Sequence, residues 1–211
     1  MHKKVIYILL TALLIFIVLS VLVVSETAYI QAFNDTTYAP VSEMISPTLT
    51  AVSIWIGRIA HVYGYVPILL LLLIIPKTRM KVGLPLAATL AVSQIIGPFI
   101  LKNIFAIERP TINQLIYQSG YGYPSGHSLG AAVFFGMCSV FVARYSSKQS
   151  LRISFTIFAA ISIIIVGLSR IYLGVHTAAD VAGGYLAGCV IVCAYILIEN
   201  RLKQRLASGS S

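Results

Sequence analysis

The chain has 211 residues, of which 58% are hydrophobic and 10% charged, and its formal net charge is +9 at pH 7. With a mean hydropathy of +0.92, this composition excludes a soluble globular domain and indicates an integral membrane protein. The fifteen Lys and Arg residues are scattered in small groups, whereas nucleic acid as a partner would require one basic face.

Apolar stretches of about 20 residues recur along the chain, and each is long enough to cross a bilayer as a helix. They predict an all-α, polytopic membrane protein. Its six transmembrane helices are expected at Val5–Val24, Ser53–Ile75, Val82–Leu101, Gly126–Tyr145, Ile153–Ile171 and Asp180–Glu199. The first stretch is longer than the apolar region of a signal peptide, and no Ala-x-Ala-like site follows it, so we expect an uncleaved anchor.

Length and hydropathy favour one integral-membrane domain, 1–206. The polar segment 25–47 is expected to be an outer loop with a short helix at the membrane interface. Residues 207–211, Ala-Ser-Gly-Ser-Ser, are set aside as an appended expression tail. The three cysteines lie inside apolar stretches and are interpreted as small buried hydrophobic residues rather than disulfide partners or metal ligands.

The basic residues between the spans define an orientation. Eleven of the fifteen fall on one side of the predicted bundle: Lys3, Lys4, Lys77, Arg79, Lys81, Arg144, Lys148, Arg152, Arg201, Lys203 and Arg205. The positive-inside rule makes this side, and with it both termini, cytoplasmic. Five of the six acidic residues lie toward the other side.

Three cations and two histidines are expected on the outer side, where orientation does not require them. Lys102 ends the third span, Arg109 follows it, and Arg170 ends the fifth span; His127 and His176 lie at the same level. This gathering predicts a binding site for an anionic group. Arg58 and His61, in the second span, are interpreted as structural.

These residues fall into three short motifs, Lys102 to Pro110, Tyr123 to Ser128 and Ser169 to Asp180. The motifs resemble the three signatures of the type 2 phosphatidic acid phosphatase superfamily, the membrane lipid phosphate phosphatases. The family pattern is Lys-x6-Arg-Pro, Pro-Ser-Gly-His and Ser-Arg-x5-His-x3-Asp, and the chain matches every position of it. The resemblance covers about Val82 to Glu199, so 82–199 is the expected catalytic core of one phosphatase domain.

The spacing does not decide which histidine is the nucleophile, and the resemblance assigns the roles. It implies that His176 attacks phosphorus to give a phosphohistidine and that His127 is the general acid. Asp180 would orient His176 if the sixth helix starts early enough to place both on one helical face. Asp180 is also a candidate helix N-cap.

Phosphoryl transfer requires neutralisation of the charge on the phosphate oxygens. Arg109 and Arg170 offer fork-shaped donors, and Lys102 adds a point charge. Ser125 and Gly126 stand where the fourth span begins, so the free N–H groups of the helix N-terminus favour an anion there. These five residues are the predicted phosphate-binding set.

No metal or cofactor is expected, because the acids near the motifs are only Glu108 and Asp180 among three cations; Glu108 is interpreted as a surface residue. The expected partners are the bilayer and a lipid phosphate. The resemblance suggests undecaprenyl diphosphate, phosphatidylglycerophosphate or phosphatidate, hydrolysed on the extracytoplasmic face of a bacterial plasma membrane, with the oligomeric state open. The alternatives are a catalytically inactive lipid-binding relative and a transporter.

Small and aromatic residues give three packing expectations. Gly126 with Gly130, and Gly184 with Gly188, are spaced for close contact between the fourth and sixth spans. Gly97-Pro98 predicts a kink in the third span. An aromatic belt is expected near the outer interface, formed by Trp55, Tyr63, Tyr65, Tyr117, Tyr121 and Tyr123.

Overall fold

The computed structural model describes residues 2–111 and 113–208, and the described residues form helices without any strand. Six helical stretches among them are long and apolar enough to cross a membrane: Lys3–Val24, Pro47–Ile74, Pro76–Phe105, Gly126–Tyr145, Gln149–Tyr172 and Ala178–Ser208. The predicted all-α fold and its six spans are therefore confirmed. Several spans run past their predicted ends, because polar residues such as Lys102 and Lys203 continue the helix. Residues 209–211 of the expected tail lie outside the described residues.

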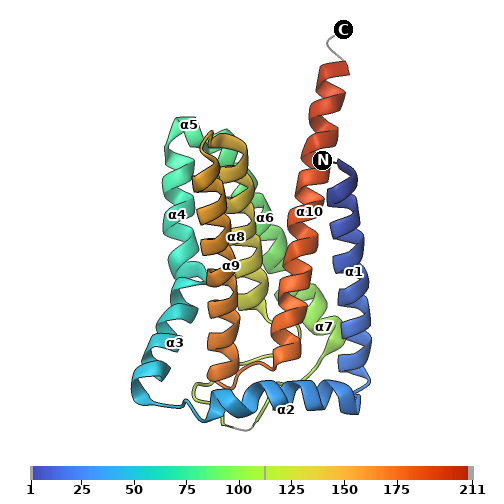
Figure 1. The fold of residues 1–211 in the computed structure, drawn as a ribbon, viewed down its shortest axis with the longest axis vertical. Coiled ribbons are helices and arrows are strands. Elements are labelled where there is room, and N and C mark those ends of the chain that lie inside the picture. Colours follow the sequence, from blue (N-terminus) through green and yellow to red (C-terminus); the bar gives the residue numbers. More distant parts are fainter. Residues whose placement is uncertain (1, 112, 209–211) are drawn as a thin grey trace.

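The spans are assembled from continuous and interrupted helices. The first two spans are α1 (His2–Val24) and the pair α3 (Pro47–Ile59) and α4 (Val62–Ile74). The third contains α5 (Pro76–Thr78), η1 (Arg79–Gly83), α6 (Leu84–Gln94), η2 (Ile95–Leu101) and α7 (Lys102–Phe105). The last three are α8 (Gly126–Tyr145), α9 (Gln149–Tyr172) and α10 (Ala178–Ser208). In the bundle, α8 packs against α6, α9 and α10 (Figure 1).

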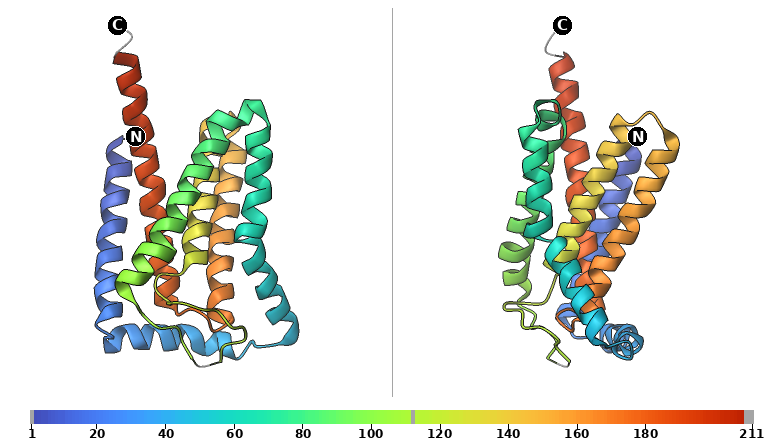
Figure 2. Two further views of the ribbon diagram at one scale, coloured as in Figure 1. Left: turned by 180° about the vertical axis from the view of Figure 1, so that it is seen from behind. Right: turned by 90° about the vertical axis from the view of Figure 1, so that its left-hand side faces the viewer.

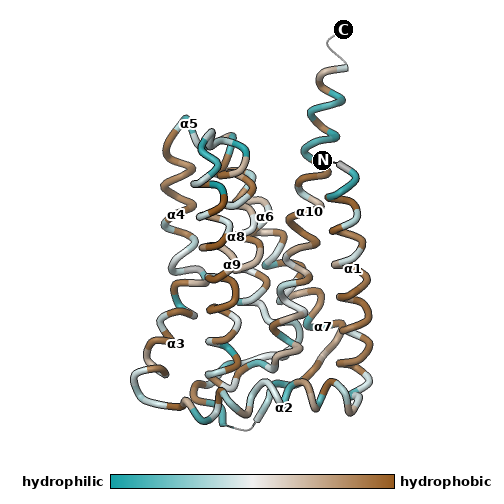
Figure 3. The backbone as a smooth tube through the Cα atoms, viewed as in Figure 1, coloured by the Kyte–Doolittle hydropathy of each residue, from teal (hydrophilic) through white to brown (hydrophobic). Residues whose placement is uncertain are grey.

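The two ends of the bundle differ in what they carry. Both termini, the turn at α5 and the connection between α8 and α9 lie at one end, and the segments 106–111 and 113–125 lie at the other (Figure 2). Hydrophobic residues dominate the middle of the helices, and polar residues gather toward the ends (Figure 3). Large apolar side chains such as Leu14, Leu71 and Ile164 are exposed on the outer faces of α1, α4 and α9, as contact with lipid requires.

Between the first two spans, α2 (Ala28–Ser42) lies across the end of the bundle that faces away from the termini (Figure 1). The predicted short helix is thus a helix of 15 residues. Thr27 caps its start, where the side-chain oxygen accepts a hydrogen bond from the Ile30 amide. Asn34 Oδ1 accepts a hydrogen bond from the Ala179 amide at 3.0 Å, which ties α2 to the first turn of α10.

The second span, expected to be one continuous helix, is interrupted. It begins at Pro47, where Ser46 provides the N-cap, and it breaks at Ala60 and His61. A Cβ atom on Gly64 would lie 1.9 Å from the carbonyl oxygen of Ile59, so only glycine permits this close crossing of the backbone. The break leaves His61 in extended backbone in front of α4.

The predicted kink at Gly97-Pro98 coincides with the π-helical segment η2. Proline has no N–H to donate and crowds the preceding turn, so the helix widens there instead of keeping α geometry. The widened segment leads into α7, whose first residue is Lys102.

Glycines of α10 set its distance from α8. A Cβ atom on Gly184 would lie 2.5 Å from the Ser125 carbonyl oxygen, and one on Gly188 would lie 2.6 Å from Ala132 Cβ. The predicted close contact therefore holds for this pair. It does not hold for Gly126 and Gly130, which face Pro98 and the side chains of Gln94 and Tyr65.

The expected aromatic belt is only partly present. Trp55, Tyr63 and Tyr117 are exposed, but Tyr65 and Tyr123 are buried. Tyr123 packs against Phe16 and Phe105 because its hydroxyl finds a partner in the bundle, Ser20 Oγ at 2.9 Å. Burial raises the pKa of Tyr123 to about 12. Through these contacts Tyr123 connects the second motif to α1.

Candidate active site

The three motifs meet at the end of the bundle that faces away from both termini (Figure 1). Lys102 begins α7, His127 lies in the first turn of α8 and Arg170 in the last turn of α9. Arg109 and His176 come from connecting segments. The site is therefore built from the ends of separate helices, and the packing of α8 against α9 and α10 positions it.

His176 is held between a carboxylate and a guanidinium. Its Nδ1 lies 3.3 Å from Asp180 Oδ2, and its Nε2 lies 3.0 Å from Arg109 Nη1. Because a guanidinium can only donate, Nε2 must accept and Nδ1 carries the proton toward Asp180. The arrangement selects the tautomer in which Nε2 offers a lone pair.

The charge state of His176 follows from its surroundings. The pKa of His176 is lowered to about 4, mostly by burial and also by the neighbouring charges of Arg109 and Lys102, whereas the hydrogen bond and charge of Asp180 oppose these effects. A group with this pKa is neutral near pH 7. A neutral imidazole with an unprotonated Nε2 is the form that can attack phosphorus.

A reciprocal capping box brings Asp180 to His176. Thr177 is the residue before α10, and its Oγ1 accepts a hydrogen bond from the Asp180 amide at 3.1 Å. Asp180 Oδ2 accepts one from the Thr177 amide at 2.9 Å. The predicted shared helical face is therefore wrong, since α10 begins at Ala178, after His176. The N-cap of α10 is Thr177, and Asp180, in the first turn of the helix, is the second residue of the capping box.

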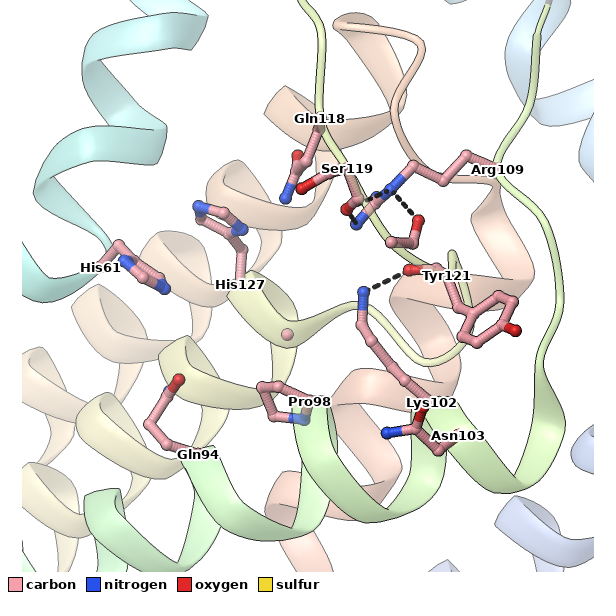
Figure 4. A pocket seen from close by; sticks show the side chains of 12 residues that line it. His61, Gln94, Pro98, Lys102, Asn103, Arg109, Gln118, Ser119, Tyr121 and His127 are labelled. Atoms are coloured by element: carbon pink, nitrogen blue, oxygen red, sulfur yellow. Dashed lines mark hydrogen bonds between the residues drawn. The ribbon is translucent and has the colours of Figure 1, made fainter.

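Arg109 and Lys102 hold the segment in front of the second motif. The Arg109 guanidinium donates to the carbonyl oxygens of Gly120 at 2.9 Å and Val175 at 2.8 Å, as well as to Ser119. Lys102 Nζ donates to the Tyr121 carbonyl oxygen. Both cations thus face a common space, shown in Figure 4.

Ser125 and Gly126 differ in what they can offer a ligand. Ser125 is fully buried as the N-cap of α8, and its Oγ accepts hydrogen bonds from the Ser128 hydroxyl and amide. Gly126 is the first residue of α8 and lines a cavity. Of the two, Gly126 is the residue placed at the helix N-terminus where an anion can approach the backbone.

Arg170 is buried, with 3% of its surface exposed. Its Nη2 donates to the Ser53 carbonyl oxygen at 2.8 Å and its Nε to Ser169 Oγ at 3.2 Å. The guanidinium lies against Gly57, where a Cβ atom would come within 2.1 Å of Nη2. Among the residues that the structure describes, no carboxylate pairs with Arg170.

Two cavities of about 380 Å³ each meet beside His127. The first cavity is lined by Lys102, Arg109 and Gly126, and the second cavity by Arg58, Gly57 and Arg170. Both are also lined by His61, Gln118 and His127, and neither has an Asp or Glu among its described lining residues. Figure 4 shows His61 beside His127 in the first cavity, with Lys102 and Arg109 across from them.

His61 and Arg58 are the residues whose position the sequence did not reveal. The rings of His61 and His127 have their centroids 4.8 Å apart, and this proximity depends on the break in the second span. A signal was present in the sequence, because a histidine and an arginine three residues apart are unusual within an apolar span.

In the described ranges, no group of three or more His, Cys, Asp or Glu side chains lies close enough together to hold a metal ion. Cys138 and Cys189 are partly buried and Cys193 is buried, and none of the three is in a disulfide within the described chain.

A helical membrane bundle with a basic, histidine-containing site at one end defines the class of protein. The family model of the PAP2 superfamily matches residues 82–204, more than half of the chain, and the chain belongs to this superfamily. Phosphatidylglycerophosphatase B of Bacillus subtilis is 34% identical over 95 residues, which is 44% of this chain and 46% of that protein. The chain thus matches about half the length of this relative.

Two further comparisons cover more of the chain. The undecaprenyl-diphosphatase of Sulfolobus acidocaldarius is 28% identical over 158 residues, 72% of either protein. The crystal structure of a transmembrane PAP2-type phosphatidylglycerolphosphate phosphatase from Bacillus subtilis has a TM-score of 0.82, covering 92% of this chain and 97% of that one. At 23% identity, this likeness shows the fold.

Proposed function

We propose that the protein is a lipid phosphatase that hydrolyses a phosphomonoester or diphosphate of a membrane lipid through a phosphohistidine on His176. The observation that carries the proposal is the neutral, Asp180-oriented imidazole whose Nε2 lies 3.0 Å from a cation of the first cavity. Membership of the PAP2 superfamily supports the same chemistry.

In the proposed reaction, phosphate oxygens compete for the N–H of Arg109 that now faces Nε2, and this releases the lone pair for attack. Lys102, Arg109, Arg170 and the amide of Gly126 neutralise the charge on phosphorus. His127 donates a proton to the leaving oxygen. Asp180 stabilises the positive charge that develops on His176, and water then hydrolyses the phosphohistidine.

We place the site at the extracytoplasmic face of a bacterial plasma membrane. The loops rich in Lys and Arg lie at the end that holds both termini, away from the motifs (Figure 2), and the positive-inside rule makes that end cytoplasmic. A site at the membrane rim suits a substrate whose chains remain in the bilayer. Undecaprenyl diphosphate, phosphatidylglycerophosphate and phosphatidate are the proposed candidates, and relatives named for the first two support them.

Release of phosphate by detergent-solubilised protein tests this function. The wild type should hydrolyse at least one of the three lipids, and His176→Ala should lower kcat roughly 1,000-fold or more because the nucleophile is gone. Full turnover in excess EDTA is expected for a metal-independent enzyme. Activity that EDTA removes and Mg²⁺ restores would overturn metal independence, and a wild type without turnover would favour a transporter or an inactive relative.

A further inference from the structure

The two histidines of the candidate site are held in different ways. The His176 ring is fixed at both nitrogens, by Asp180 and by Arg109. Within residues 2–111 and 113–208, no hydrogen bond or ion pair fixes the His127 ring, and the ring contact that it makes is with His61. A general acid must lie within hydrogen-bond reach of the oxygen that it protonates, so the His127 ring requires another means of orientation.

The His61 ring is the group that lies against His127. The ring centroids are 4.8 Å apart and the planes are inclined by 31°, a separation at which aromatic rings attract one another. Both rings line both cavities, together with Gln118. Figure 4 shows them side by side, across the first cavity from Lys102 and Arg109. His61 is therefore the neighbour that can limit rotation of the His127 ring.

The side chain of His61 is not used to stabilise its own helix. His61 is the N-cap residue of α4, in extended backbone, yet its side chain accepts no hydrogen bond from the first turn of that helix. N-caps are usually Ser, Thr, Asp or Asn, because their side-chain oxygens accept hydrogen bonds from the free amides. The break in the second span thus presents an imidazole to the cavities without making it a cap.

The start of α4 is tied to the helix that carries His127. The amides of Gly64 and Tyr65 donate to the His61 carbonyl oxygen at 3.2 and 3.0 Å. The Tyr65 ring stacks on Phe134 of α8, with centroids 4.4 Å apart and planes inclined by 14°. Since α8 also carries His127, packing between α4 and α8 sets the distance between the two imidazoles.

We propose that His61 is a positioning residue whose ring orients the His127 imidazole for proton donation to the leaving oxygen. This inference rests on the proposed phosphatase function and adds to it a residue from outside the three motifs. In the step concerned, His176 Nε2 forms a bond to phosphorus while the bond from phosphorus to the leaving oxygen breaks. The electron pair goes to the leaving oxygen, which takes the proton of His127.

The effect of His61 should depend on the leaving oxygen. The alkoxide that leaves from phosphatidate is a strong base and requires the proton of His127, whereas p-nitrophenolate is a weak base and can leave without it. The value of kcat/KM reports only the steps up to departure of the leaving group, so the later hydrolysis of phosphohistidine does not affect it. The ratio of kcat/KM for phosphatidate to that for p-nitrophenyl phosphate therefore measures proton donation by His127.

Two substitutions of His61 test this role with the two substrates. His61→Ala should lower kcat/KM roughly 10- to 100-fold for phosphatidate and less than about 3-fold for p-nitrophenyl phosphate, because the ring that orients the acid is gone. His61→Phe keeps a ring and loses both nitrogens, and it should stay within about 5-fold of the wild type for both substrates. Tyr63→Phe removes an exposed hydroxyl beside the same helix break and is the matched control, which should change neither value.

Two results would overturn the positioning role. One is a loss of equal size for both substrates in His61→Ala, since a general disturbance of the fold does not depend on the leaving oxygen. The other is a His61→Phe protein as impaired as His61→Ala, since the nitrogens and not the ring contact would then be required. Should His61→Ala fail to fold, His61→Asn, which removes the ring with a smaller change in volume, should give the same losses.

A measurement without substrate separates this inference from the phosphatase function. The chain has four histidines, so His127→Asn protein can assign the His127 ring resonances by NMR in detergent. In His61→Ala protein these resonances should shift and broaden as the ring rotates, while those of His176, fixed at both nitrogens, should stay in place. Unchanged His127 resonances would overturn the inference even in an active phosphatase, whereas a wild type without turnover would overturn the phosphatase function alone.

Discussion

At the scale of single residues, the two groups that flank His176 determine its tautomer and ring orientation. Arg109 faces Nε2 and Asp180 faces Nδ1, so the tautomer and the direction of the lone pair are both fixed before a substrate arrives. The spacing of the third motif indicated that His176 and Asp180 are close. It did not indicate the contact with Arg109, because that residue is 67 positions away in the chain and only the fold brings it near.

The pH dependence of kcat/KM tests this arrangement. Since the pKa of His176 is lowered to about 4, the proposed nucleophile is neutral above that pH, and activity should fall as the pH drops through about 4. Asp180→Asn removes the carboxylate that raises this pKa, so the acidic limb should move to still lower pH while kcat falls roughly 100- to 10,000-fold. An acidic limb near 6.5 in the wild type would contradict the buried, neutral imidazole.

Gly57 controls the position of the Arg170 guanidinium. Gly57→Ala would place a methyl group 2.1 Å from Nη2, so the guanidinium must move, and kcat/KM should fall roughly 10- to 100-fold. Arg170→Lys should cause a loss of similar size. In the double variant the losses should not multiply, because both act through one group, whereas multiplicative losses would show that Gly57 acts elsewhere.

At the scale of helices, the contact between α8 and α10 joins the second motif to the third. The Ser125 amide donates to the Asp180 carbonyl oxygen at 2.9 Å, and Gly184 lies against the Ser125 carbonyl oxygen. At the other end of the same helices, Arg144 Nη1 and Glu199 Oε2 form an ion pair at 2.6 Å. The relative position of His127 and His176 therefore depends on the packing of these two helices.

Gly184→Ala should disturb this contact. Its Cβ would lie 2.5 Å from a backbone oxygen that cannot rotate away, so we expect a loss of about 1–3 kcal/mol in the free energy of unfolding, seen as a lower melting temperature in detergent. Gly130→Ala in α8 is the matched control, since its Cβ would find ordinary contacts at 3.7 Å. Equal melting temperatures for both variants would refute the role of Gly184.

Helices were predictable from sequence to the extent that hydropathy alone determines them. The range of α8, Gly126 to Tyr145, agrees with the prediction, because a Ser N-cap and a polar connection bound an apolar stretch there. The break at His61 was not predictable in this way, since it arises from the close backbone crossing at Gly64. Tyr123 was misplaced for a similar reason, because its burial depends on Ser20 of another helix.

At the scale of the whole molecule, the basic loops and the candidate site lie at opposite ends of the bundle. The basic loops and both termini lie at one end, and the three motifs, α2 and the segments 106–111 and 113–125 lie at the other (Figure 1). The six spans and this separation were predictable from the sequence, whereas the two cavities were not, because they depend on how the second span packs beside α8 and α9.

Cysteine labelling in intact bacteria tests the proposed orientation. In a background with Cys138, Cys189 and Cys193 replaced by Ala, a membrane-impermeant thiol reagent should label Asp35→Cys, on α2, in intact cells. Lys148→Cys, between α8 and α9, should react only after permeabilisation, because the proposed orientation places its basic loop in the cytoplasm. Both parent positions are exposed. The reverse pattern would place the active site in the cytoplasm.

The capping box at Thr177 and Asp180 has a consequence for reading other members of the superfamily. The Asp180 carboxylate both caps the last helix and orients the His176 imidazole. A relative without hydrolytic activity would therefore still need the aspartate to stabilise its last helix. Retention of that position is then a poor sign of an active enzyme. The histidine at position 176 caps no helix, so its replacement would be the clearer mark of a protein that only binds lipid.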